Sequence, residues 1–119
     1  MLEGLNLKRG DILSLPSGEY DGAPLKGFDN DGFPILDNPF NFLKLELIGF
    51  DRGSRGGAET IPTFIALKRN SSSGVIVNMA SYDWCSSAGF GNPTSGEKIK
   101  TITKNAILKL LDNTTVFSN

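Results

Sequence analysis

The residue types that most often perform chemistry in proteins are sparse in this chain. Its 119 residues include no histidine and a single cysteine, Cys85. Ser-His and Cys-His nucleophile pairs are therefore excluded, as are zinc sites that need an imidazole ligand. A lone cysteine without a histidine base is a poor nucleophile, so we expect Cys85 to be an ordinary, half-buried thiol. The sequence predicts no metal and no cofactor.

Two short motifs partly resemble ligand-binding loops. The segment Gly91-Asn-Pro-Thr-Ser-Gly-Glu-Lys98 approximates a phosphate-binding loop, in which lysine directly follows the second glycine. Here Glu97 intervenes, and its carboxylate would repel phosphate, so a turn before a capped helix is the better interpretation. Asp29, Asp31 and Asp37 lack the spacing of a calcium-binding loop, and a hairpin turn explains them.

Carboxylate pairs for hydrolysis assemble in three dimensions and have no fixed spacing in a sequence. None of the 13 acidic residues stands out from the others. We therefore expect a non-catalytic binding domain, and a carboxylate-based hydrolase is the third alternative.

One group of residues has the composition of a nucleic-acid-binding surface. Proteins that hold single strands pair cations with phosphates and stack aromatic rings on bases. A predicted basic hairpin, its flanks and the glycine-rich loop before it supply both kinds of side chain. The candidate nucleic-acid-binding residues are Arg52, Arg55, Phe64, Lys68, Arg69, Tyr82 and Trp84. The structural alternative is that the rings pack against neighbouring strands and the cations are solvated.

The polar, glycine-rich segment 83–95 is the second candidate surface, and we expect it to lack regular structure. Long loops inside small domains are often functional. Trp84 and Phe90 lie in this segment and either contact a partner or pack back on the loop itself. The segment thus favours a protein-interaction or assembly module that docks through loop 83–95 and an edge strand.

The charge is divided unevenly along the chain. Residues 1–51 carry four basic and nine acidic groups, a net charge of −5, whereas residues 52–119 carry eight basic and four acidic groups, a net charge of +4. Such asymmetry either steers an anionic partner to one face or lets the two halves attract each other. The acidic pI of about 5.3 argues against strong binding to nucleic acid.

Short strands separated by turns account for most of the apolar pattern. We expect a strand over 10–16, a hairpin over 23–37 around an Asp-Asn-Asp-Gly turn, and a second hairpin formed by 61–69 and 75–82. Residues 42–50 alternate with period two, which places the leucines at 43, 45 and 47 on one face. The glycine-rich residues 51–58 predict a loop.

A helix over 96–112 is expected near the carboxyl end. Thr94 and Glu97 have the spacing of a capping box. Apolar residues then recur at helical spacing, at Ile99, Ile102, Ala106, Ile107 and Leu110. The β-branched run 99–103 is also compatible with a strand.

These elements predict one domain over residues 1–119 that is mainly β, a β-rich α+β fold. A small antiparallel barrel or curled sheet, of OB-like or SH3-like size and with one C-terminal helix, fits the elements. With neither a signal pattern nor a transmembrane run, we expect a cytoplasmic protein. Its expected partner is single-stranded DNA or RNA, and the alternative is a protein partner or self-association, as in a small viral or bacterial accessory protein.

Overall fold

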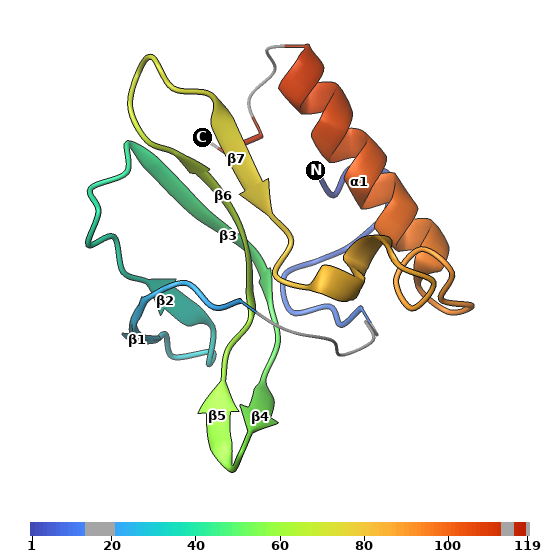
Figure 1. Cartoon of the computed structure of the whole chain (residues 1–119), viewed down its shortest axis with the longest axis horizontal. Helices are drawn as coiled ribbons and strands as arrows, with labels where there is room; N and C mark the ends of the chain where they lie inside the picture. The colour runs from blue at the N-terminus through green and yellow to red at the C-terminus, as the bar shows by residue number, and fades with distance from the viewer. Residues whose placement is uncertain (14–20, 113–115, 119) are drawn as a thin grey trace. The chain divides into compact units, whose positions relative to one another are not determined.

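The computed structural model describes residues 1–13, 21–112 and 116–118. The chain divides into two compact units: unit 1 combines Met1–Glu19 with Ser81–Asn119, and unit 2 is Tyr20–Ala80. The described part forms seven strands, one short 3-10 helix and one α-helix (Figure 1). The predicted mainly β fold with a C-terminal helix is confirmed, while the single-domain expectation stays a prediction.

Unit 2 contains all the described strands, in three small antiparallel sheets. One sheet pairs β1 (Leu25–Phe28) with β2 (Pro34–Leu36), and another pairs β4 (Gly53–Arg55) with β5 (Ala58–Thr60). The largest contains β3 (Lys44–Phe50), β6 (Thr63–Lys68) and β7 (Val75–Asn78), in the order β3-β6-β7. The described strands form no closed barrel, and a curled sheet stays a prediction.

Both predicted hairpins are confirmed, and their turn residues supply the physical reason. In the β1–β2 turn, the Asp29 carboxylate accepts hydrogen bonds from the backbone N–H groups of Asp31 and Phe33, both at 2.9 Å. In the β6–β7 turn, the side-chain oxygen of Asn70 accepts from the N–H groups of Ser72 and Ser73. Asx side chains stabilise turns in this way, so Asp29 serves the hairpin.

Two local predictions were wrong. Residues 51–58 do not form only a loop, because Gly56 and Gly57 both have positive φ and close a tight β4–β5 hairpin. Two such residues make the turn that matches the twist of paired strands. Residues 10–13 of the strand expected over 10–16 are not in a strand, and residues 14–16 lie outside the described residues.

A second set of contacts ties the start of unit 2 to β6. The N–H of Thr63 donates to Asp21 O at 3.1 Å, and its Oγ1 accepts from the N–H of Ala23 at 2.7 Å. Thr63 is almost fully buried, and both bonds satisfy polar groups that burial would otherwise leave unpaired. The ring of Phe33 meets the ring of Phe50 edge-on, with 5.6 Å between centroids, and so packs the β1–β2 hairpin against β3.

Unit 1 is built around α1 (Gly96–Leu111). Ile99, Ile102 and Ala106 of the predicted stripe are buried, but Ile107 and Leu110 are exposed, which corrects the prediction for those two. The β-branched run 99–103 is helical, and its threonine hydroxyls donate hydrogen bonds to backbone carbonyl oxygens of the helix. The hydroxyls of Thr101 and Thr103 donate to the carbonyl oxygens four residues earlier, at 2.9 and 2.8 Å.

The predicted capping box was also wrong. Ser95 occupies the N-cap position of α1 and makes no side-chain capping hydrogen bond. The Asn92 side chain instead accepts from the N–H groups of Thr94 and Ser95, and its carbonyl accepts from the N–H of Gly96. This Asx turn places the helix start one residue later than the box requires. Within the described residues, no helix is long and apolar enough to cross a bilayer.

Candidate interaction surface

The β3-β6-β7 sheet presents a row of aliphatic side chains on one face. Its register sets Leu45 of β3 opposite Leu67 of β6, and Leu67 opposite Ile76 of β7. Residues directly opposite in an antiparallel pair share a face, so these three side chains form one row across the sheet. Leu45 and Leu67 are half-buried, but Ile76 is 58% exposed. The row therefore ends in solvent at β7.

The two edges of this sheet differ in how well they are protected. The β3 edge carries Lys44 and Glu46, and its register shifts at a bulge between Leu47 and Gly49. Charges and bulges prevent an edge from pairing with another strand. The β7 edge, Val-Ile-Val-Asn, has no charge, no proline and no register shift, and β7 pairs with β6 alone among the described strands.

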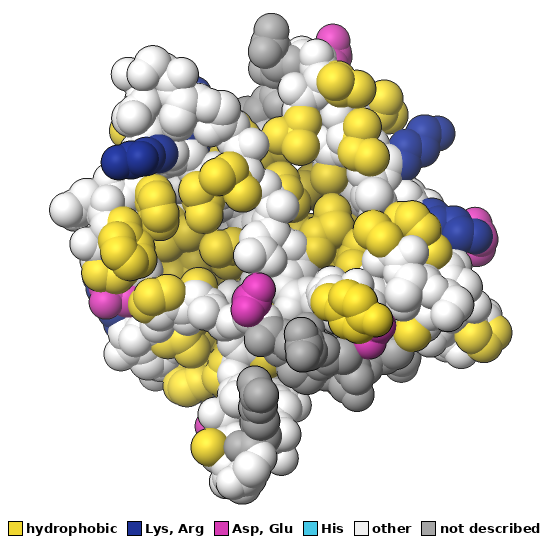
Figure 2. All heavy atoms as spheres, viewed as in Figure 1, with side chains coloured by type: hydrophobic (Ala, Val, Ile, Leu, Met, Phe, Trp, Pro, Cys, Tyr) yellow, Lys and Arg dark blue, Asp and Glu magenta, His cyan; other side chains and the backbone are white. Residues whose placement is uncertain are grey.

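Apolar side chains are abundant on the surface of unit 2. Figure 2 shows hydrophobic side chains gathered where Figure 1 draws the β3-β6-β7 sheet. Among the described residues of this unit, the exposed large apolar ones are Phe28, Ile35, Phe40, Leu43 and Ile76. Single exposed apolar residues are ordinary, but a row continuous with an unpaired strand marks an interaction surface.

Arg52, predicted to bind phosphate, is engaged within unit 2. Its guanidinium donates to Glu59 at 2.8 Å and to Gly32 O at 3.3 Å, and it lies over the Phe28 ring, 4.5 Å from the centroid. These contacts clamp the β1–β2 and β4–β5 hairpins together, so the charge of Arg52 is already matched. Arg55 lies in β4, and its side chain is outside the described part.

The remaining unit 2 candidates differ in exposure. Phe64 is buried, so its ring is not available to stack on a base, as the structural alternative predicted. Lys68 is half-buried and Arg69 is exposed. Lys68 lies directly opposite Lys44 in the β3–β6 register, so two cationic side chains share one face of the sheet.

The candidates Tyr82, Trp84 and Phe90 belong to unit 1. Trp84 lies in η1 (Tyr82–Cys85) and is 5% exposed, with its Nε1–H donating to Thr103 Oγ1 at 2.8 Å. It packs within the protein and presents no free ring face. Tyr82 is 77% exposed, and Phe90 is half-buried.

Segment 83–95 is not the unstructured loop that we expected. It contains the end of η1 and a series of turns with backbone bonds such as Gly89 N–H to Ser86 O at 3.2 Å. A Cβ on Gly89 would overlap the carbonyl oxygen of Trp84, so the chain is folded tightly on itself here. Cys85 is exposed instead of half-buried, because η1 turns Trp84 inward and Cys85 outward.

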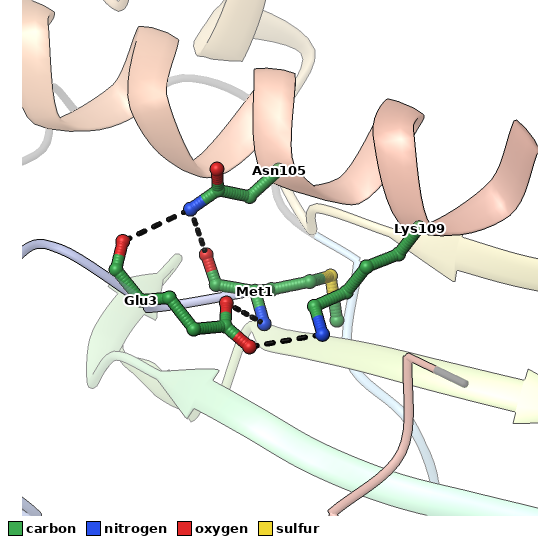
Figure 3. A network of polar contacts seen from close by, with 4 residues as sticks. All are labelled: Met1, Glu3, Asn105 and Lys109. Atoms are coloured by element: carbon green, nitrogen blue, oxygen red, sulfur yellow. Dashed lines mark hydrogen bonds and ion pairs between the residues drawn. The ribbon is translucent and has the colours of Figure 1, made fainter. Parts of the chain in front are cut away.

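A compact polar network joins the first residues of unit 1 to α1 (Figure 3). The Glu3 carboxylate pairs with the Met1 amine at 2.7 Å and with Lys109 Nζ at 2.9 Å. The Asn105 amide donates to the carbonyl oxygens of Met1 and Glu3. Hydrogen bonds from the Met1 amine, and then from Lys109, lower the pKa of Glu3 from 4.5 to about 2.

This network predicts an acid-dependent part of the stability of unit 1. The folded pKa of Glu3 lies below its ordinary value, so its contribution is present above pH 4.5 and disappears as the pH falls toward 2. We expect Glu3→Gln to lower the melting temperature at pH 6 and to have little effect near pH 2. Lys109→Gln should lose only part of this pH dependence, because the Met1 amine remains. Thermal melting between pH 2 and 7 measures this, and an equal deficit at both ends would contradict it.

Groups of three or more potential metal-ligating side chains do not occur among the described residues. Comparison with protein-family models, with curated proteins and with solved structures gives no match for this chain.

The sequence predicted that an edge strand would dock a partner, but it did not identify β7 as that strand. The signal was present in Val75-Ile-Val-Asn78, which lacks the charges and proline that protect exposed strands. What the sequence does not contain is the strand order, which makes β7 an edge.

Proposed function

We propose that this chain is a non-catalytic protein-interaction module whose partner adds a strand to the β7 edge of unit 2. The observation that carries this proposal is the unprotected edge of β7, with exposed Ile76 at the end of the aliphatic row. Strand addition uses the free backbone N–H and C=O groups of an edge for affinity and the adjoining side chains for specificity.

The energetics favour occupation of this edge. A strand paired with β7 would cover Ile76. Its own side chains on that face would continue the row that Leu45 and Leu67 begin. Removing apolar surface from water contributes roughly 25 cal/mol per Å². Among the described strands β7 pairs with β6 alone, so a strand added on its other side would also gain backbone hydrogen bonds, and both contributions point to one mode of binding.

Binding of single-stranded nucleic acid is the second hypothesis. Arg52 is paired with Glu59, and Phe64 and Trp84 are buried, which weakens three of its seven proposed contacts. Lys68, Arg69 and Tyr82 remain as candidates, and the side chain of Arg55 lies outside the described part of the chain. Docking through loop 83–95 loses support in the same way, since Trp84 is not available as an anchor.

Site-specific photo-crosslinking tests the proposed surface whatever the identity of the partner. A benzophenone side chain is placed at Ile76, and separately at Leu43, which is 56% exposed but lies beside the other edge of the sheet. We expect a discrete adduct from position 76 and none from position 43 under the same conditions. No adduct at 76 would overturn the proposal. A third probe at Leu111, which is 77% exposed, tests α1, and an adduct only from that position would move the surface to the helix.

A further inference from the structure

We infer that the strand added to β7 is β7 of a second copy of this chain, paired antiparallel about a two-fold axis through Ile76. This inference rests on the proposed function and names its partner. It follows from the register of the sheet and from the charges at the two ends of β7.

The register makes the β7 edge complementary to itself. A two-fold axis perpendicular to the sheet keeps each face continuous between the copies, so residues that pair across it must share a face. Ile76 opposite Ile76 of the second copy meets this condition, and Val75 then lies opposite Val77. The row Leu45–Leu67–Ile76 continues directly into Ile76–Leu67–Leu45 of the second copy. No charged or bulged residue interrupts it.

The charges at the two ends of β7 are opposite. At the β6–β7 turn stands Arg69, next to Lys68, which pairs with Val75. At the other end stands exposed Asp21, whose N–H donates to Ala80 O at 2.9 Å. Antiparallel pairing brings the Arg69 end of each copy toward the Asp21 end of the other. A parallel pairing would instead set like charges together, so the charges select the antiparallel mode.

The β3 edge is less suited to the same contact. Two β3 strands would have to pair across the bulge between Leu47 and Gly49. The bulge interrupts a regular ladder along this edge. With four residues in β7, we expect a weak dimer held by a small interface.

Sedimentation equilibrium of the full chain tests the dimer, with Ile76→Lys compared against Leu43→Lys. Ile76 and Leu43 have nearly equal exposure, so a lysine at either position should affect solubility to the same extent. The two variants differ in which edge of the sheet carries the new charge. We expect the wild type to pass from monomer to dimer between about 1 μM and about 1 mM. Ile76→Lys should raise the dissociation constant by about tenfold or more, and Leu43→Lys should leave it within about twofold. Equal effects of both substitutions, or a monomeric wild type throughout, would overturn the inference.

Charge exchange gives a second, independent readout of the two-fold arrangement. Arg69→Glu and Asp21→Lys should each weaken self-association, because each sets like charges at both ends of the paired strands. Mixing the two variants restores both opposite-charge contacts, so the mixture should dimerise where neither variant does alone. A mixture that stays monomeric at concentrations where the wild type is dimeric would overturn the antiparallel mode.

The failure of this inference is distinguishable from failure of the proposed function. A monomeric chain that still gives an adduct with a different protein from position 76 keeps the strand-addition surface and rejects the second copy. A monomeric chain with no adduct from position 76 rejects both.

Discussion

Replacing Ile102 with alanine is expected to lower the free energy of unfolding of unit 1 by about 2–5 kcal/mol. Ile102 is 1% exposed and lies on the buried face of α1, between Ile99 and Ala106. Truncation removes three methyl or methylene groups from this packing and leaves a cavity that the helix cannot fully close. The loss is both of transfer free energy and of van der Waals contact.

Ile107→Ala in the same helix is the matched control, because Ile107 is 51% exposed. We expect its effect to be within about 0.5 kcal/mol, since alanine also has the higher helix propensity. Urea unfolding followed by the fluorescence of Trp84, the single tryptophan and a buried residue of unit 1, compares the two variants. Equal destabilisation by both would show that α1 does not bury the face assigned to it.

Gly89→Ala is expected to cost about 1–3 kcal/mol or more, although it adds only one methyl group. A Cβ at this position would overlap the carbonyl oxygens of Trp84 and Asp83. These are backbone atoms of η1 and cannot rotate away, so the segment must shift and the bond from Trp84 Nε1 to Thr103 is strained with it.

Gly74→Ala is the control for Gly89→Ala. Nothing lies within 4 Å of a Cβ at Gly74, and its φ is not positive, so alanine there is expected to be neutral or slightly stabilising. Thermal melting and the Trp84 emission maximum measure both variants. A Gly89→Ala variant as stable as the wild type, with unchanged emission, would mean that segment 83–95 is not tightly packed.

The residues whose substitution is predicted to affect folding and those proposed to bind a partner lie in different units of this chain. The buried face of α1 and the turns of segment 83–95 determine whether unit 1 folds. The Ile76 side chain of β7 should contribute little to the folding of unit 2, because it is mostly exposed. Substitution at Ile76 is therefore expected to change association much more than stability, which separates an interaction residue from a core residue.

Sequence reasoning succeeded where the deciding contacts lie within a few residues. The Asp29 and Asn70 turns were predictable because each side chain bonds to backbone groups two to four residues ahead. The alternation of Leu45 and Leu47 with Lys44 and Glu46 is a property of any strand, and the spacing of Ile99, Ile102 and Ala106 is a property of any helix.

Sequence reasoning could not locate contacts whose partner lies far along the chain. Trp84 is buried with a bond to Thr103, 19 residues away, and Arg52 is held by Phe28, Gly32 and Glu59. Both look like binding residues when only composition is considered. Whether a ring or a cation is available to a partner depends on what the fold places against it, and local patterns do not contain that.

Residue types and short-range spacing were enough to establish the strand and helix periodicities, the two hairpin turns and the exclusion of histidine-dependent chemistry, because each is a local property of the chain. The folded arrangement was needed to show that β7 is an edge among the described strands, that exposed Ile76 ends the aliphatic row, and that Phe64 and Trp84 are internal. Strand order and burial arise from contacts between segments that are distant in the chain. The candidate surface therefore became visible only once those segments were placed side by side within unit 2.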